Sequence, residues 1–169
     1  MFGKVKRWLG IEGVKLELIV PEEINRKTQM VSGKVRFSSM HAQKVTSIKV
    51  KMVERFVRGR GKDKMIDEYV LGKIELKKSF EIPTDENIEI EFDLAFDLMK
   101  SDMDKMQEKN LVVGGLIQAA KWMRGVKSDF RIEAEAEVSG TALNPFDKKT
   151  VVLGSQGRNV KPKNINLKM

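Results

Sequence analysis

Cysteine is absent from the 169-residue sequence, and histidine occurs once, at position 41. Without cysteine, the chain can form no disulfide and offers neither a thiol nucleophile nor a thiolate metal ligand. Structural zinc sites are built mostly from cysteine and histidine, so this composition excludes them. A reducing compartment fits the composition, and we expect a cytoplasmic protein.

Long apolar runs are also absent, since no stretch approaches the roughly 20 residues that a membrane-spanning helix needs. The basic N-terminal segment "MFGKVKRWLG" is followed by Glu12 and Gly13, so the roughly 7 to 15 apolar residues of a secretion signal are missing. Phe2 and Trp8 are at helical spacing beside basic residues. We expect them either to cover a sheet edge or to touch a membrane surface.

The sequence is rich in segments that alternate apolar and polar residues, as in "IEIEFDLAFDL" at 88–98. A period of two is typical of half-buried strands. Similar segments occupy 14–20, 30–39, 45–57, 65–72, 73–82, 129–140 and 148–154. The alternation changes phase near Val53, which predicts a β-bulge or a strong twist there. The pattern predicts an all-β antiparallel sandwich of seven or eight strands.

One region departs from this period. From Met99 onward the apolar residues are at helical spacing until Gly125, which predicts a helical insertion at about 99–125. A chain of this length normally forms one domain around one core. We therefore expect a single sandwich domain at 1–155, with 156–169 as a basic tail or an edge strand.

Positive charge is concentrated around the segment "RGRGKDK". Positions 44 to 64 contain eight basic residues and only two acidic ones, Glu54 and Asp63. Positions 81 to 104 show the opposite balance, with nine acidic residues and one basic residue. The glycines do not have the spacing of a phosphate-binding loop. The cationic side chains here are candidates for partner binding: Arg55, Arg58, Arg60, Lys62 and Lys64.

Two sets of carboxylates recur at a spacing of two and therefore share a strand face: Glu89, Glu91 and Asp93, and Glu133, Glu135 and Glu137. They could bind a cation or a basic partner, but the favoured interpretation is a solvated face opposite lysine and arginine on neighbouring strands. Such a face provides no apolar pocket for a catalytic acid. We expect no enzymatic activity, no catalytic residue, no metal site and no cofactor.

The strand aromatics Phe37, Phe92, Phe96 and Phe130 are in phase with the inward residues, so they are not expected to stack on bases. Nucleic acid is therefore not an expected partner.

Two further motifs are "VSGKV" at 31–35 and "NPFDKK" at 144–149. With the order of the strands, they make residues 1–155 resemble the N-terminal half of the bacterial sporulation-control proteins, a family with the arrestin-like, immunoglobulin-like β-sandwich fold. Members of that family usually carry a second sandwich domain, and the insertion at 99–127 is longer here. The resemblance brings no catalytic residues and implies a scaffold or adaptor that binds proteins.

We therefore expect a non-catalytic adaptor that receives a partner segment at its sheet edges or on a sheet face. The basic loop would attract an acidic or phosphorylated protein. The alternative is peripheral binding to anionic lipids through the same loop and the N-terminal segment.

Overall fold

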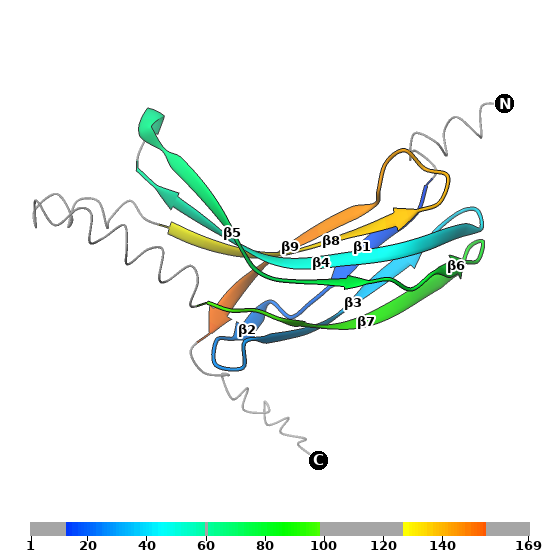
Figure 1. Ribbon diagram of the computed structural model, residues 1–169, viewed down its shortest axis with the longest axis horizontal. Coiled ribbons are helices and arrows are strands. Elements are labelled where there is room, and N and C mark those ends of the chain that lie inside the picture. Colours follow the sequence, from blue (N-terminus) through cyan, green and yellow to red (C-terminus); the bar gives the residue numbers. More distant parts are fainter. Residues whose placement is uncertain (1–12, 60, 99–126, 155–169) are drawn as a thin grey trace, which may run out of the picture.

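The computed structural model describes residues 13–59, 61–98 and 127–154 (Figure 1). The predicted helical insertion at 99–125 and the predicted tail at 156–169 lie outside these residues. The N-terminal segment that contains Phe2 and Trp8 lies outside them as well. Nearly all of the described chain is either β-strand or a connection between strands.

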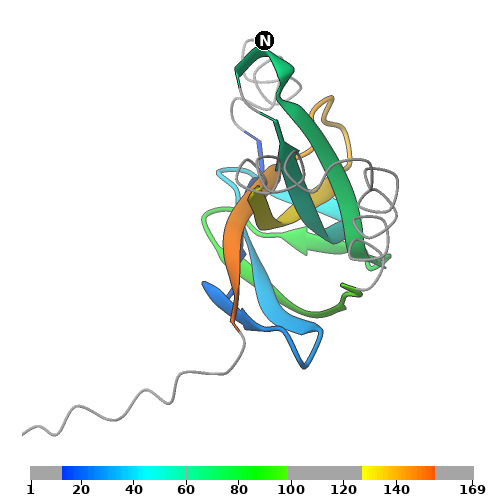
Figure 2. The same cartoon turned by 90° about the vertical axis from the view of Figure 1, so that its left-hand side faces the viewer.

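The strands form two sheets that pack face to face (Figures 1 and 2). The smaller sheet has the order β1-β3-β7, with β1 Lys15–Ile19, β3 Met30–Ser38 and β7 Asn87–Ala95. The larger has the order β2-β9-β8-β4-β5, and β6 also pairs with β4. Its strands are β2 Glu23–Asn25, β4 Gln43–Arg58, β5 Met65–Leu76, β6 Phe80–Ile82, β8 Lys127–Val138 and β9 Phe146–Gly154.

The predicted antiparallel sandwich is confirmed. Seven strands have five or more residues, and the two additional strands, β2 and β6, have three residues each. Strands this short contain too few residues to show an alternating pattern. Every described pairing is antiparallel except that of β2 with β9.

The core consists of the alternate residues that the sequence pattern assigned to the inner face. Fully buried apolar side chains come from both sheets: Val31, Val35, Phe37 and Leu94 from the smaller, and Ile48, Val50, Met52, Ile132 and Ala134 from the larger. Phe37 meets Phe80 edge to face, with ring centroids 5.4 Å apart and an interplanar angle of 62°. This aromatic pair joins β3 of one sheet to β6 of the other, so it fixes how the sheets face each other.

The irregularity predicted near Val53 is confirmed, but the extra residue belongs to the partner strand. Met52 pairs with Gly72 and Val53 pairs with Val70, which leaves Leu71 as the bulged residue of β5. Across this point β4 keeps its phase, because Glu54 takes an inward position and is 0% exposed. The irregularity of β4 itself lies earlier, between Val45 and Ser47, where its register with β8 shifts by one residue. A glutamate on the inner face is what made the alternation look broken in the sequence.

The chain crosses from the smaller to the larger sheet directly after β7. The amide N–H of Asp97 donates to the carbonyl oxygen of Leu71 at 2.9 Å. At this crossing Gly72 lies against the backbone of Ala95 and Phe96, so closely that a Cβ on Gly72 would be 3.0 Å from the Cα of Phe96. The crossing therefore holds the end of β7 beside the middle of β5.

Candidate functional site

The main candidate site is the open side of the sandwich where β5 and β7 lie side by side (Figure 1). Strand β5 is the last strand of the larger sheet, and β7 is the last strand of the smaller one. Among the described residues, the Asp97 to Leu71 bond is the one backbone hydrogen bond that joins the two sheets on this side. In the part of the chain that the structure describes, no strand pairs with the outward backbone groups of Lys73–Leu76 or of β7, so these groups form two free strand edges.

A groove of about 660 Å³ runs between these edges. Three apolar side chains, Ile74, Leu76 and Phe92, line it together with charged side chains from both sheets: Lys34, Glu75, Glu91 and Asp93. Its volume falls within the roughly 300 to 1,000 Å³ of typical ligand pockets. The groove combines an apolar lining, a charged rim and two unpaired backbones, which is what an incoming extended segment requires.

The glycine of the "VSGKV" motif gives this groove its shape. A Cβ on Gly33 would be 2.7 Å from Cζ of Phe92, 2.8 Å from Cγ1 of Val20 and 2.9 Å from the carbonyl oxygen of Ile19. Real Cβ atoms essentially never lie this close to another heavy atom. Glycine is therefore needed at this position so that the Phe92 ring can lie against β3 and line the groove.

The solvent face of the smaller sheet carries paired charges, as the favoured interpretation predicted. Arg36 contacts Glu89 at 2.9 Å and Glu17 at 3.2 Å. Lys34 lies 3.6 Å from Glu89 and 3.5 Å from Glu91. The hydrogen bond from Arg36 lowers the pKa of Glu89, and the same bond raises the pKa of Arg36.

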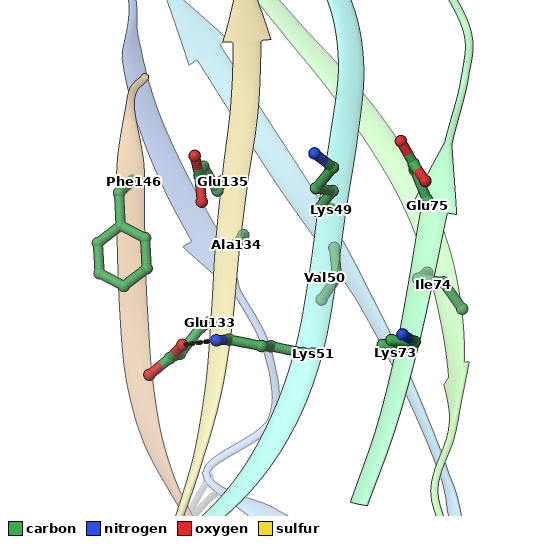
Figure 3. A pocket seen from close by; sticks show the side chains of 10 residues that line it. All are labelled: Lys49, Val50, Lys51, Lys73, Ile74, Glu75, Glu133, Ala134, Glu135 and Phe146. Atoms are coloured by element: carbon green, nitrogen blue, oxygen red, sulfur yellow. Dashed lines mark ion pairs between the residues drawn. The ribbon is translucent and has the colours of Figure 1, made fainter. Parts of the chain in front are cut away.

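A second hollow of about 390 Å³ lies on the outer face of the larger sheet (Figure 3). Its charged lining comes from β5, β4 and β8: Lys49, Lys51, Lys73, Glu75, Glu133 and Glu135. Phe146 borders it and is 51% exposed. Three ammonium groups against three carboxylates leave no net charge, so this surface has no strong preference for an ion of either sign.

The most enclosed charge of this hollow is Glu133, whose side chain is 9% exposed. Its carboxylate contacts Nζ of Lys51 at 3.0 Å and also Nε of Arg131. A second guanidinium nitrogen of Arg131, Nη2, contacts Glu68 at 2.8 Å. Burial raises the pKa of Glu133, but the hydrogen bonds from Lys51 and Arg131 outweigh it, so the net shift is downward. The buried carboxylate is therefore held in its ionised form.

This shift predicts how stability depends on pH. A carboxyl whose pKa is lowered by folding stabilises the protein above its unfolded pKa, and that contribution is lost as the pH falls through the folded value. We expect Glu133→Gln to lower the free energy of unfolding by about 1 to 3 kcal/mol near pH 7, and the difference from wild type to shrink below about pH 4. Urea titrations at both pH values measure this, and a difference independent of pH would contradict it.

The predicted cationic residues occupy the hairpin that joins β4 and β5. Lys62 belongs to the short 3-10 turn η1 Gly61–Asp63 at the hairpin tip, Lys64 follows it, and both are exposed. Arg58 is 18% exposed and contacts Asp67 at 2.8 Å, within the hairpin. Arg55 is half-buried in β4, opposite Glu68 of β5.

The structure therefore places Lys62 and Lys64 where they can meet a partner, while Arg58 also holds the hairpin together. Arg60, Phe2 and Trp8 lie outside the described residues. None of the described helices is both long and apolar enough to cross a membrane. In the described ranges, no group of three or more histidine or acidic side chains is placed to hold a metal ion.

The sequence did not identify the groove residues as a site. Ile74, Leu76 and Phe92 have the spacing of ordinary inward strand residues, and Glu91 that of an ordinary outward one. They become a site because β5 and β7 are both terminal strands, and this depends on pairings between distant parts of the chain. The glycine of "VSGKV" was the one local signal of a close approach.

The two packed sheets, antiparallel except where β2 pairs with β9, form a β-sandwich of the arrestin-like class. A profile of the family described as SpoOM protein matches residues 2–100, so the chain belongs to this family and the resemblance is confirmed. The fold is similar to that of Spo0M, the sporulation control protein from Bacillus subtilis, with a TM-score of 0.58 and 14% identity. That match covers 85% of this chain and 50% of the other, so this chain spans half the length of the Bacillus protein. No curated protein sequence matches.

Proposed function

We propose that this chain is a non-catalytic cytoplasmic adaptor, which binds an extended segment of a protein partner in the groove between β5 and β7. Membership of the SpoOM protein family supports a regulatory role. The observation that carries the proposal is the groove itself, with free strand edges from both sheets on its two sides. A segment bound there would add a strand to the sandwich.

Strand addition suits this edge for a physical reason. The main-chain hydrogen bonds of an added strand supply affinity, while the pockets for alternate side chains supply selectivity. Free edges invite unwanted pairing, and natural sheets protect them with charged side chains. Here the carboxylates of Glu91 and Asp93, which belong to β7, disfavour pairing with strands whose side chains do not complement negative charge. Ile74 and Leu76 still offer apolar contacts to a strand that does.

The hairpin tip has a separate role in this proposal. Lys62 and Lys64 are exposed and have no ion-pair partner among the described residues, so they can attract an acidic or phosphorylated surface of the partner. Attraction of this kind acts mainly on the association rate and weakens with salt. The groove then retains the segment that the tip has helped to bring close.

Crosslinking from the groove tests the proposal. The natural chain has no cysteine, so Glu91→Cys creates a single attachment point for a photoreactive maleimide on β7. Lys148→Cys provides a matched control, because Lys148 is exposed on β9 at the far side of the larger sheet. Both labelled full-length variants are irradiated in lysate from the cells that produce the protein.

We expect a discrete crosslinked protein from position 91 and none from position 148. Excess unlabelled wild type should suppress it, and mass spectrometry should map the crosslinks to one extended segment of the partner. The same crosslinks from both positions, or none from either, would count against the groove as the binding site.

A further inference from the structure

Strand β7 presents two different faces to any strand that joins its free edge. Its inward residues are apolar and contribute to the core and the groove: Ile88, Ile90, Phe92 and Leu94. Its outward residues at the intervening positions are all acidic: Glu89, Glu91 and Asp93. An incoming strand must match both faces, because adjacent side chains on one face of a sheet contact each other.

The molecule already contains one solution to this requirement. On its other edge, β7 pairs with β3, whose outward residues include Lys34 opposite Glu91 and Arg36 opposite Glu89. The inward residues of β3 include Val35 and Phe37, opposite Ile90 and Ile88. The strand that β7 accepts within the fold thus alternates apolar and basic side chains, and the sheet forms ion pairs along this seam.

We propose that the free edge of β7 selects a partner segment of the same chemistry as β3, alternating apolar residues with lysine or arginine. This inference rests on the proposed function and adds the composition of the bound segment. The apolar residues would enter the groove against Ile74 and Leu76, and the basic ones would lie outward beside Glu91 and Asp93.

The outward carboxylates of β7 can still bind basic side chains of an added strand. Glu89 is bound by Arg36, but the side chain of Glu91 is 78% exposed and lies 3.5 Å from Lys34. Asp93 accepts a hydrogen bond from the hydroxyl of Ser32 and has no ion-pair partner in the described ranges. Both carboxylates can therefore form further charge-assisted contacts with an added strand.

The same charges argue against two other occupants. If β7 paired with β7 of a second copy around a two-fold axis at Glu91, Glu91 would face Glu91, and Glu89 would face Asp93. Directly opposed like charges destabilise a sheet, so the edge is protected against self-association. An acidic segment would meet the same carboxylates and also Glu75 on the opposite side of the groove.

Synthetic peptides test the inference directly on the full chain. The basic probe is a nine-residue peptide, matched to the nine residues of β7, that alternates valine with lysine or arginine. The acidic probe replaces each basic residue by glutamate, and a third peptide has the basic composition with its order scrambled. Binding is measured by fluorescence anisotropy at low and at physiological salt, with wild type, Glu91→Lys and Glu22→Lys.

We expect the basic probe to bind about tenfold or more tightly than the other two. The acidic probe replaces attraction by repulsion at three outward positions, and the scrambled probe loses the alternation that places its apolar and basic residues on opposite faces. Glu91→Lys should weaken it by about threefold or more. Glu22→Lys makes the same charge change in the exposed turn before β2 and should leave the affinity unchanged.

Tighter binding of the acidic probe, equal binding of all probes or binding of none would overturn the inference. So would a dimer that the basic peptide dissociates, because the natural occupant would then be a second copy. Crosslinking from position 91 reports an occupied groove whatever the charge of the segment. A wrong composition is therefore distinguishable from a wrong site.

Discussion

Replacing Gly72 by alanine is expected to destabilise the protein by about 3 kcal/mol or more, at the upper end of the usual cost of overpacking. The new Cβ would be placed on the carbonyl oxygen of Ala95 and 3.0 Å from the Cα of Phe96. These are backbone atoms, so no side-chain rotation can relieve the clash. Relief requires the chain after β7 to move away from β5, which breaks the 2.9 Å hydrogen bond from Asp97 to Leu71. Denaturant titration measures the loss.

Gly154→Ala is the matched control for this prediction. A Cβ on Gly154 would meet the carboxylate end of the exposed Glu23 side chain, which can rotate away. We expect a change below about 1 kcal/mol. Equal losses for the two glycine variants would show that the crossing at Gly72 has no special constraint. Because this crossing holds β7 beside β5, folding should be verified before any effect of Gly72→Ala on binding is interpreted.

The sequence predicted the strands well because alternation is local information. Two strands show its limit: β7 carries Glu89, Glu91 and Asp93 outward, and β8 carries Glu133, Glu135 and Glu137 outward. The patterns are nearly identical, yet β8 lies between β4 and β9 while β7 is an edge strand. Strand order depends on pairings between residues far apart in the chain, so no local pattern could show which acidic strand borders a binding groove.

The hairpin cations show the same limit at the level of single side chains. The sequence grouped Arg58 with Lys62 and Lys64 because all three carry positive charge in one short segment. In the structure Arg58 pairs with Asp67, since the hairpin register aligns Arg58 with Met65 and brings the return strand beside it. Charge density along a sequence counts basic residues but does not reveal which of them are already neutralised.

Phe37→Ala is expected to lower the free energy of unfolding by about 3 to 5 kcal/mol, the usual cost of removing a buried phenylalanine. Phe37 is 0% exposed, and its ring meets Phe80 edge to face across the two sheets. Truncation leaves a cavity and removes the aromatic contact between β3 and β6. Since native domains are stable by only about 5 to 15 kcal/mol, the variant should unfold at a much lower denaturant concentration.

Phe146→Ala separates burial from the mere loss of an aromatic ring. Phe146 is 51% exposed, so its removal should lower the free energy of unfolding by less than about 1 kcal/mol.

A double variant of Phe37 and Phe80 should lose less stability than the sum of the two single variants, because each single change already removes their mutual contact. Additive losses would mean that the two rings stabilise their sheets independently. The relative placement of β7 and β5, and with it the groove, would then depend on the crossing at Gly72 rather than on the aromatic pair.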